Sequence, residues 1–328
     1  MSKLLEIKNL NLCFQGEEQM YQVLWNVNLS FEKGMIHSLV GESGCGKTMT
    51  AMSVMRLLPK NSVITSGEVI FNDEDLLKYK ESQMRNLRGN KIALIPQDPM
   101  TSLDPLYTIG NQIVESIQAH SKVTKRQALR KAREVLDMVK IPDVDKKLNY
   151  YPHEFSGGMK QRVIIAMALA CNAELIIADE PTTALDVTIQ AQIMDLILEL
   201  NQQLQMGVML ITHDLAVVAE TCTRAIVMYL GQVVEEASVE DLFQHPMHPY
   251  TQGLIASVPR LYAPSKERLH VIEGTVPFLN DIPTGCRFAP RCAYATDHCY
   301  IQMPELVTVG NQKVRCWRVC QGGGVCND

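Results

Sequence analysis

The chain has 328 residues, of which 46% are hydrophobic and 20% charged, a composition typical of a folded globular protein rather than a disordered or fibrous one. Its 31 Lys and Arg against 36 Asp and Glu give a net charge of −5, which lacks the basic excess of general nucleic-acid binders. The N-terminus shows no apolar core long enough for a signal peptide, and the longest apolar run, 163–171, is about half of a bilayer span. We therefore expect neither secretion nor membrane insertion, and we expect the ten cysteines to be reduced thiols or metal ligands.

The first part of the chain and its middle show two different hydrophobic patterns. Residues 4–14 and 23–34 alternate between apolar and polar positions, which predicts antiparallel strands with one buried face. Later apolar runs do not alternate, as expected of strands buried on both faces of a mainly parallel sheet; they are 36–40, 91–96, 174–179, 208–212 and 225–229. Helical patterns lie between these runs at 124–139, 157–171 and 187–205. The alternation of strands and helices predicts an α/β fold.

The chain is predicted to divide near 236–245. Residues 1–240 would form the α/β domain, with an antiparallel β subdomain and an inserted helical subdomain at about 99–157. Residues 241–328 contain many prolines and six of the ten cysteines. We expect them to form a small, irregular, Cys-rich C-terminal domain.

The stretch GESGCGKT at 41–48 follows an apolar strand and precedes a helical run, which is the setting that a phosphate-binding P-loop requires. Its glycines let the backbone N–H groups face phosphate oxygens, and the following helix adds its positive end. Lys47 would neutralise the β- and γ-phosphates of ATP, and Thr48 would supply a hydroxyl to Mg²⁺. The predicted phosphate-binding residues are Gly41, Ser43, Gly44, Cys45, Gly46, Lys47, Thr48 and Met49.

Two carboxylates follow the apolar run at 174–179. Asp179 ends this run and would ligate Mg²⁺, and Glu180 comes directly after it. A carboxylate one step beyond the metal ligand is well placed to orient and deprotonate an attacking water. Isolated acidic pairs are usually solvated turns, but a strand that delivers the pair favours the catalytic interpretation.

Residues 155–162, FSGGMKQR, resemble the signature motif of the ATP-binding cassette (ABC) ATPases. The other motifs of this family occur in family order: the P-loop, a glutamine after a strand at Gln97, the signature, the acidic pair at 179–180, TALD at 183–186 and ITHD at 211–214. The resemblance covers residues 14–214. It implies the P-loop ABC ATPase fold and an active, Mg²⁺-dependent ATPase.

The resemblance also implies roles for residues beyond the P-loop. Ser156, Gly157 and Gly158 would cover the γ-phosphate of ATP held by a second cassette, in a head-to-tail dimer with two ATPs between the protomers. Asp186 belongs to the loop that crosses this interface. His213 resembles the histidine that contacts the γ-phosphate and holds the catalytic water and base in place.

The same family pattern points to the adenine and to Mg²⁺. Gln97 resembles the residue that meets Mg²⁺ and water and reports on the partner domain, so it joins Thr48 and Asp179 as a predicted Mg²⁺ ligand. Phe14 lies at the position of the aromatic residue that packs under adenine, and Tyr21 is the alternative. Cys45 stands where serine or alanine is commoner, and neither this departure nor others in the motifs removes a catalytic group.

Three stretches resemble the oligopeptide/dipeptide importer branch of the family: 96–113, 178–197 and 245–261. This resemblance implies two membrane permease subunits, a second cassette that is identical or paralogous, an extracytoplasmic peptide-binding protein acting indirectly, and a place at the cytoplasmic face of the membrane. Physically, 245–261 can also be interpreted as a proline-bounded amphipathic surface helix.

Other function classes fit less well. Nickel and glutathione importers share much of this pattern, so their cargoes are the alternative. DNA-repair ATPases of the family carry long insertions between the P-loop and the signature, and its translation factors carry two cassettes in one chain. This chain has neither feature, and we expect no nucleic-acid partner.

The C-terminal cysteines predict a structural clamp. Disulfides are disfavoured in the cytosol, and small irregular domains often need a metal. A structural zinc site usually shows a closely spaced C-x2–4-C pair, whereas iron–sulfur clusters also take four thiolates. The C-terminal segment resembles that of peptide-importer cassettes with a [4Fe–4S] cluster, which implies cluster ligands; zinc and free thiols are the alternatives. The expected ligands are Cys286, Cys292, Cys299 and Cys316, with Cys320 or Cys326 as competitors of the last.

Overall fold

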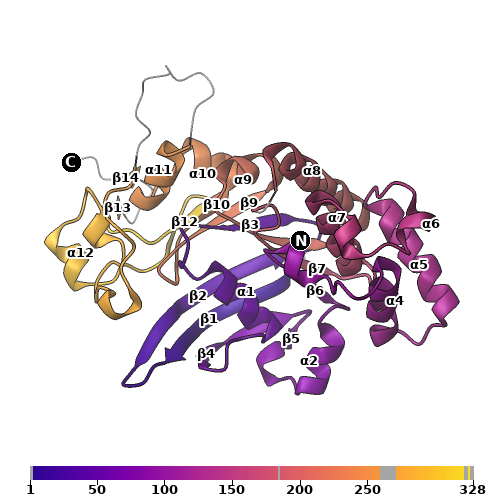
Figure 1. Ribbon diagram of the computed structural model, residues 1–328. Helices are drawn as coiled ribbons and strands as arrows, with labels where there is room; N and C mark the ends of the chain where they lie inside the picture. Colours follow the sequence, from indigo (N-terminus) through magenta and orange to yellow (C-terminus); the bar gives the residue numbers. More distant parts are fainter. Residues whose placement is uncertain (1–2, 184, 259–270, 321–323, 326–328) are drawn as a thin grey trace. The chain divides into compact units, whose positions relative to one another are not determined.

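The computed structural model describes residues 3–183, 185–258, 271–320 and 324–325. It forms two compact units, each made of several chain segments. The first unit comprises Met1–Leu4, Phe31–Ile36 and Asp75–Ile211, and the second comprises Leu5–Ser30, His37–Glu74 and Thr212–Asp328. Figure 1 labels the helices and strands of both units.

The first unit contains a parallel sheet of buried strands. In this sheet β7 (Leu175–Asp179) pairs in parallel with β6 (Ile92–Ile95) on one side and with β8 (Gly207–Thr212) on the other. Every residue of β7 and β8 is buried, which explains why their sequences are apolar without alternation. The predicted strands at 91–96, 174–179 and 208–212 are therefore confirmed to within a residue or two.

Helices account for most of the rest of this unit, and α4, α5 and α7 pack on one another (Figure 1). Thr108 and Thr124 begin α4 and α5 because their hydroxyls accept hydrogen bonds from the first-turn N–H groups of Asn111 and Gln127. The helical elements are η1 (Leu76–Lys78), α2 (Glu81–Leu87), α3 (Pro99–Ser102), α4 (Ile109–His120), α5 (Lys125–Met138), α6 (Val144–Lys147), η2 (Pro152–Glu154), α7 (Gly157–Leu169) and α8 (Val187–Leu204). The expected helical segment at 99–157 thus contains α3 to η2.

The second unit contains an antiparallel sheet near the N-terminus. Its strand order is β2-β1-β4-β5, formed by β1 (Lys3–Gln15), β2 (Met20–Glu32), β4 (Ser62–Phe71) and β5 (Glu74–Asp75). Leu5 lies opposite Phe71 in the antiparallel pair of β1 and β4. The alternation of buried and exposed residues along β1 and β2 confirms the predicted antiparallel strands.

A second sheet of this unit joins the P-loop strand to the C-terminal residues. Its order is β11-β12-β10-β9-β3, formed by β3 (Ile36–Val40), β9 (Arg224–Tyr229), β10 (Gln232–Ser238), β11 (Val307–Val309) and β12 (Gln312–Val314). Strands β3 and β9 are parallel to each other, whereas β10 is antiparallel to both β9 and β12. The C-terminal segment therefore contributes strands to the sheet that carries the P-loop.

The remaining elements of the second unit are short. They are α1 (Lys47–Met55), α9 (Leu215–Thr221), α10 (Val239–Gln244), α11 (Pro249–Ala256), η3 (Leu279–Asp281), η4 (Ala289–Arg291), α12 (Asp297–Ile301), β13 (Val319–Cys320) and β14 (Gly324–Val325). No helix among the described residues is long and apolar enough to cross a membrane.

Part of the C-terminal segment shares a core with the strands that flank the P-loop, and a smaller cluster is its own: Val309, Val314 and Val319. Tyr250 of α11 and Phe288 belong to the same buried cluster as Val40 of β3 and Tyr229 of β9. The two units also divide the chain differently from the predicted boundary between 240 and 241. A separate Cys-rich domain is thus not confirmed, because Tyr250 and Phe288 are buried with residues of β3 and β9.

Candidate functional site

The predicted P-loop lies in the second unit, between β3 and α1. Gly41 has a φ of +152°, and a Cβ there would lie 2.3 Å from the carbonyl oxygen of Met228 and 2.8 Å from Cys45 Sγ. Gly46 is the N-cap of α1 in the left-handed conformation. Only glycine takes up both backbone requirements without strain, so the local fold explains the glycines of the motif.

The Lys47 side chain is held inside this loop. It is 5% exposed, and its Nζ donates to the carbonyl oxygens of Gly41 at 2.7 Å and Glu42 at 3.1 Å. Burial raises the pKa of the neighbouring Cys45 thiol, so Cys45 stays neutral and adds no negative charge beside Lys47. Phosphate oxygens can replace the carbonyls as acceptors from Lys47, because charge-assisted hydrogen bonds are the stronger ones.

The other predicted residues of the loop lie more openly. Ser43, Gly44 and Thr48 are exposed, and Met49 is half-buried in the first turn of α1. An open hydroxyl and backbone at the start of a helix are what the binding of phosphate and Mg²⁺ requires. The assignments of these residues to phosphate and Mg²⁺ stay predictions.

In the first unit, Gln97 and Glu180 are brought together although they are far apart in the sequence. Gln97 Nε2 donates to Glu180 Oε2 at 3.0 Å, and Thr183 Oγ1 donates to the same oxygen at 2.9 Å. Glu180 has a φ of +48°, which is strained for a residue with a side chain. Such strain is typical of functional positions, and Thr183 is a partner that the sequence analysis did not single out.

Asp179 precedes this group at the end of β7. It is 5% exposed and lies in register with Ile211 of β8. The N–H of Glu180 donates to the Ile211 carbonyl oxygen at 2.9 Å, so the turn that carries both carboxylates is fixed to the neighbouring strand. The parallel sheet thereby positions the two acidic side chains at its carboxyl edge.

The signature residues begin α7. The hydroxyl of Ser156 accepts from the N–H of Met159 as the N-cap, and Gly157 and Gly158 form the first turn. A Cβ at Gly158 would lie 2.5 Å from Ile189 Cγ2, which explains a glycine there. The exposed Ser156 and these glycines leave the helix N-terminus open to an anion.

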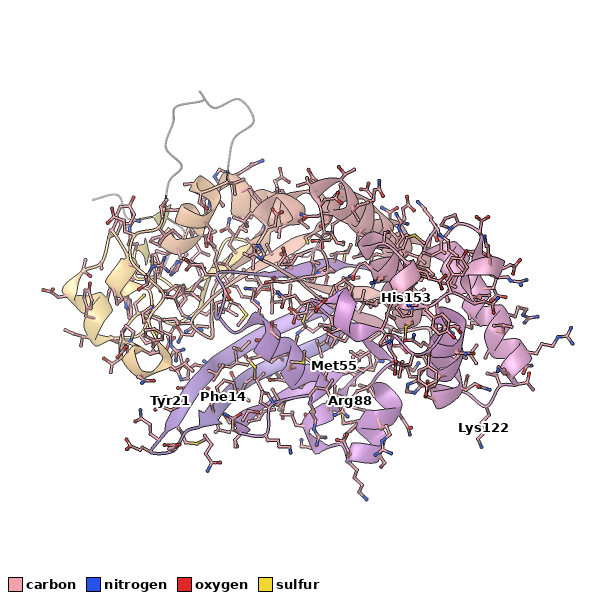
Figure 2. The ribbon with its side chains drawn as sticks, in the orientation of Figure 1. Phe14, Tyr21, Met55, Arg88, Lys122 and His153 are labelled. Atoms are coloured by element: carbon pink, nitrogen blue, oxygen red, sulfur yellow. The ribbon has the colours of Figure 1, made fainter. Side chains whose placement is uncertain are left out.

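Asp186, His213 and the candidate adenine residues each lie at an element end or on a strand. Asp186 caps α8 by accepting from the N–H of Ile189 at 3.0 Å, and the exposed His213 lies between β8 and α9. Phe14 lies on β1 and Tyr21 on β2, both half-buried (Figure 2). The geometry does not distinguish between these two aromatic residues.

The four predicted cluster ligands line one cavity of the second unit: Cys286, Cys292, Cys299 and Cys316. Tyr294, Trp317 and Arg318 are among the other lining residues. Burial raises the pKa of three of these thiols, that of Cys316 to about 11. Within the described residues, no group of three or more His, Cys, Asp or Glu side chains is arranged to hold a metal ion. The predicted metal site is therefore not confirmed. Cys326 lies outside the described residues.

Two further residues contact the P-loop and were not predicted to do so. Tyr250 and Arg291 both contact Glu42, the second residue of the P-loop motif. The interpretation of 245–261 as a surface helix is thus too simple, since Tyr250 is fully buried. No local pattern could have revealed these contacts, because more than half of the chain separates the partners.

Comparison with known proteins supports the family that the motifs indicate. Residues 24–183 match the ABC transporter family, and residues 234–299 match the family described as the oligopeptide/dipeptide transporter C-terminal region. The chain is 53% identical over 317 residues to a protein named as a probable peptide ABC transporter ATP-binding protein in Sinorhizobium fredii, covering 96% of this chain and 95% of that protein. It is 46% identical to the dipeptide transport ATP-binding protein of Haemophilus influenzae, covering 95% and 94%.

A solved structure shares the fold. It is a dimeric ATP-binding cassette in a post-hydrolysis state with ADP and phosphate, and it matches with a TM-score of 0.64 and 29% sequence identity. The match covers 72% of this chain and 98% of that one. The P-loop ABC ATPase fold predicted from the motifs is therefore confirmed.

Proposed function

The chain belongs to the ATP-binding subunits of the oligopeptide/dipeptide family of ABC transporters, and from this premise we propose that it hydrolyses ATP to power the import of short peptides. The main support for a peptide cargo is the match of residues 234–299 to the C-terminal region of oligopeptide/dipeptide transporters. The name of the Haemophilus relative supports the same cargo. Nickel and glutathione are the alternative cargoes.

In the proposed reaction, the second unit binds the phosphates of ATP. Lys47 exchanges its carbonyl partners in the P-loop for the β- and γ-phosphate oxygens, and Phe14 packs under the adenine. Thr48, Gln97 and Asp179 would hold Mg²⁺, whose charge offsets that of the phosphates. Their hydroxyl, amide and carboxylate oxygens fit the ligand preference of this cation.

The carboxylate of the first unit activates the water. Glu180 takes the proton of the attacking water as general base, and Gln97 and Thr183 hold its carboxylate through the two hydrogen bonds to Oε2. His213 contacts the γ-phosphate. Ser156, Gly157 and Gly158 stabilise the γ-phosphate of an ATP held by a second cassette, with Asp186 in the loop that crosses the interface.

The proposed assembly is a pair of cassettes under two permease subunits at the cytoplasmic face of the membrane. The dimeric state of the solved cassette supports the pairing. The second cassette is a copy of this chain or a paralogue, and an extracytoplasmic peptide-binding protein delivers the cargo to the permeases.

We also propose that the four C-terminal cysteines hold a [4Fe–4S] cluster, which they would ligate as thiolates and which would stabilise the segment around them. All four line one cavity, so one group could reach all of them, and a [4Fe–4S] cluster takes four thiolates. Iron and acid-labile sulfide in anaerobically purified protein, both lost in Cys292→Ser, would support the cluster; one zinc and no iron would refute it.

The test of the function is Glu180→Gln in the complex reconstituted with its permeases. Loss of a positioned general base should lower kcat roughly 10²–10⁴-fold while ATP still binds and holds the cassettes together. The matched control is Glu199→Gln, the same change at an exposed residue of α8 that pairs with Lys140. Turnover by Glu180→Gln at the rate of the control would refute the assignment of the base.

Cargo and partners are tested on the unmodified complex. Pull-down from membranes should return permease subunits, and ATP-driven uptake should accept di- and oligopeptides in preference to nickel and glutathione. Uptake of nickel or glutathione alone would assign the alternative cargo. Recovery of ribosomes or DNA in place of permeases would contradict the transport function.

A further inference from the structure

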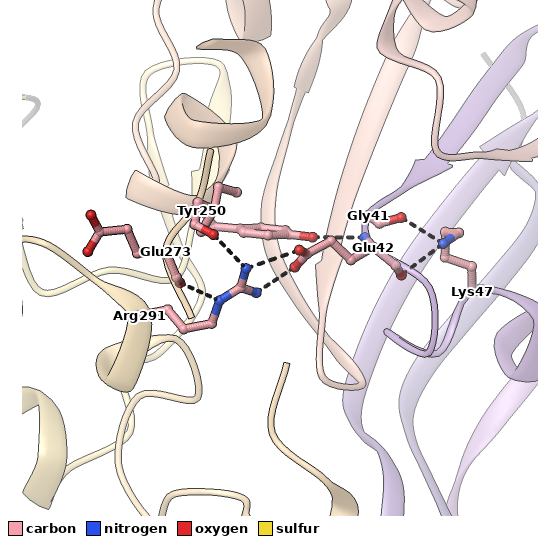
Figure 3. Close-up of polar contacts among 7 residues, drawn as sticks. Gly41, Glu42, Lys47, Tyr250, Glu273 and Arg291 are labelled. Carbon is pink, nitrogen blue, oxygen red and sulfur yellow. Dashed lines mark hydrogen bonds and ion pairs between the residues drawn. The ribbon is translucent and has the colours of Figure 1, made fainter. Parts of the chain in front are cut away.

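Glu42 of the P-loop is bound by residues from the C-terminal part of the chain (Figure 3). Its N–H donates to the Tyr250 hydroxyl oxygen at 2.8 Å. Its carboxylate receives two hydrogen bonds from Arg291, from Nη1 to Oε2 at 2.6 Å and from Nη2 to Oε1 at 3.1 Å. Its carbonyl oxygen accepts from Lys47. Every polar part of this residue thus has a partner, and two of the three partners lie more than 200 residues away in the sequence.

Contacts other than those with Glu42 also hold the Arg291 side chain in place. Its side chain is only 4% exposed, and its Nε donates to the carbonyl oxygen of Glu273 at 3.0 Å. Its guanidinium lies 5.9 Å from the ring centroid of Tyr229. A bidentate arginine–carboxylate pair is more directional than a single-contact ion pair. Because the Glu42 side chain is 29% exposed, loss of Glu42 would leave the Arg291 charge buried, whereas loss of Arg291 would leave a half-buried carboxylate.

Tyr250 is fixed equally well. Its ring is fully buried, with its centroid 4.8 Å from that of Tyr229 and 5.4 Å from that of Phe288. Phe288 also packs edge-on against Tyr229, so two mutually packed aromatic rings hold the Tyr250 ring and its hydroxyl in place. A hydroxyl held by packing is a positioned hydrogen-bond acceptor rather than a rotating surface group.

We propose that Arg291 and Tyr250 are positioning residues for ATP binding, which they support by fixing the Glu42 peptide of the P-loop. This inference rests on the proposed function of the loop. The Glu42 and Gly41 carbonyl oxygens hold Lys47 Nζ, so the orientation of the Glu42 peptide determines where the ammonium lies when the phosphates arrive. Preorganised groups bind a ligand with a smaller loss of conformational entropy.

The same short segment also lines the cysteine cavity. Cys292 follows Arg291 directly and contributes to that cavity with Cys286, while Phe288 between them packs on Tyr250. The C-terminal segment therefore supports the phosphate-binding loop through residues that lie between these two cysteines in the sequence. This arrangement gives the C-terminal region a role in nucleotide binding in addition to any partner contacts.

The experiment measures MgATP affinity by calorimetry on the full chain and kcat and KM in the reconstituted complex. Arg291→Met should weaken ATP binding about tenfold or more and raise KM, with kcat at saturating ATP within about twofold of wild type. Arg291→Lys should restore part of the affinity, because it keeps the charge but loses the bidentate geometry. Tyr250→Phe removes one hydroxyl and should weaken binding about two- to fivefold.

The matched control is Arg287→Met. Arg287 belongs to the same segment, is 5% exposed, donates to the carbonyl oxygen of Leu230 and packs over Trp25. Equal losses of ATP affinity in Arg287→Met and Arg291→Met would overturn the proposal, because the effect would then be general destabilisation. Unchanged affinity in Arg291→Met would overturn it as well.

A double-mutant cycle makes the test independent of folding losses. Arg291→Met, Glu42→Gln and the double variant should be strongly non-additive, with the double variant no weaker than the worse single variant. Additive losses would show that the two residues act separately and would refute the proposal. Lys47→Ala serves as the reference for the proposed function itself: if wild type and Lys47→Ala bind ATP equally, the P-loop assignment fails instead.

Discussion

The two parts of the predicted nucleotide site are held in different ways. In the second unit, the P-loop is fixed through its main chain, by glycine conformation, by the carbonyl partners of Lys47 and by Tyr250 from the C-terminal region. In the first unit, Glu180 is held by the side chains of Gln97 and Thr183, both exposed. The first part is held through main-chain groups and is called the rigid part below, whereas the second is held by exposed side chains and is called the open part.

This difference has a functional consequence. A rigid loop suits the binding of phosphates, whose positions change little, whereas an open carboxylate can change its partners when ATP and water arrive. Changes around the P-loop should therefore alter affinity and stability. Changes around Glu180 should alter turnover with little effect on affinity.

The largest expected effect on the rigid part comes from Gly41→Ala. The new methyl group would lie 2.3 Å from the Met228 carbonyl oxygen, and such overpacking costs roughly 1–3 kcal/mol, in addition to the backbone strain. Gly44→Ala is the control, because Gly44 also has a positive φ but no atom within 4 Å of the added methyl. Urea unfolding should show a clearly larger loss for Gly41→Ala. Equal losses would mean that conformation alone, and not close approach, selects the glycine.

The sequence predicts those parts of the site that a short motif specifies by itself. The P-loop, the strand that ends at Asp179 and the start of α7 at Ser156 are local patterns, and their elements were predicted to within a few residues. The contact of Glu42 with Arg291 could not be predicted in this way, since neither residue lies in a pattern that names the other. The short strands β11 and β12 were also missed, because strands of three residues are too short to show a periodicity.

Acidification should lower the free energy of unfolding through His248, which lies in the second unit. His248 is buried, and its Nδ1 accepts from the N–H of Tyr250 at 3.0 Å as the N-cap of α11. Burial, followed by the charge of Arg315, lowers the pKa of His248 from 6.5 to about 3. Because the unfolded state binds the proton more readily, the contribution of His248 is complete above pH 6.5 and is lost as the pH falls toward 3.

His248→Asn tests this expectation, since asparagine keeps a capping oxygen but does not titrate. Below pH 6.5 the wild type should lose up to about 1.4 kcal/mol of unfolding free energy per pH unit more than the variant. Glu235 accepts from the His248 N–H, and its pKa, raised by burial, acts in the opposite sense in both proteins, so the difference between them isolates His248. Urea midpoints between pH 7 and 5 provide the measurement. Parallel pH dependences of the two proteins would contradict the assignment.

The smallest expected effect concerns the open part, at Thr183. Its hydroxyl donates to Glu180 Oε2 at 2.9 Å, so Thr183→Val removes one hydrogen bond to the proposed base while it keeps the shape of the side chain. A hydrogen bond of this kind contributes about 1 kcal/mol, which corresponds to about a fivefold lower kcat. Thr183→Ser should restore the rate because it restores the donor, and KM for ATP should stay unchanged in both variants because Thr183 lies outside the P-loop. Steady-state ATPase rates of the reconstituted complex measure both constants. A raised KM with normal kcat would mean that this threonine acts in nucleotide binding, and the distinction between a rigid binding part and an open catalytic part would then fail at this residue.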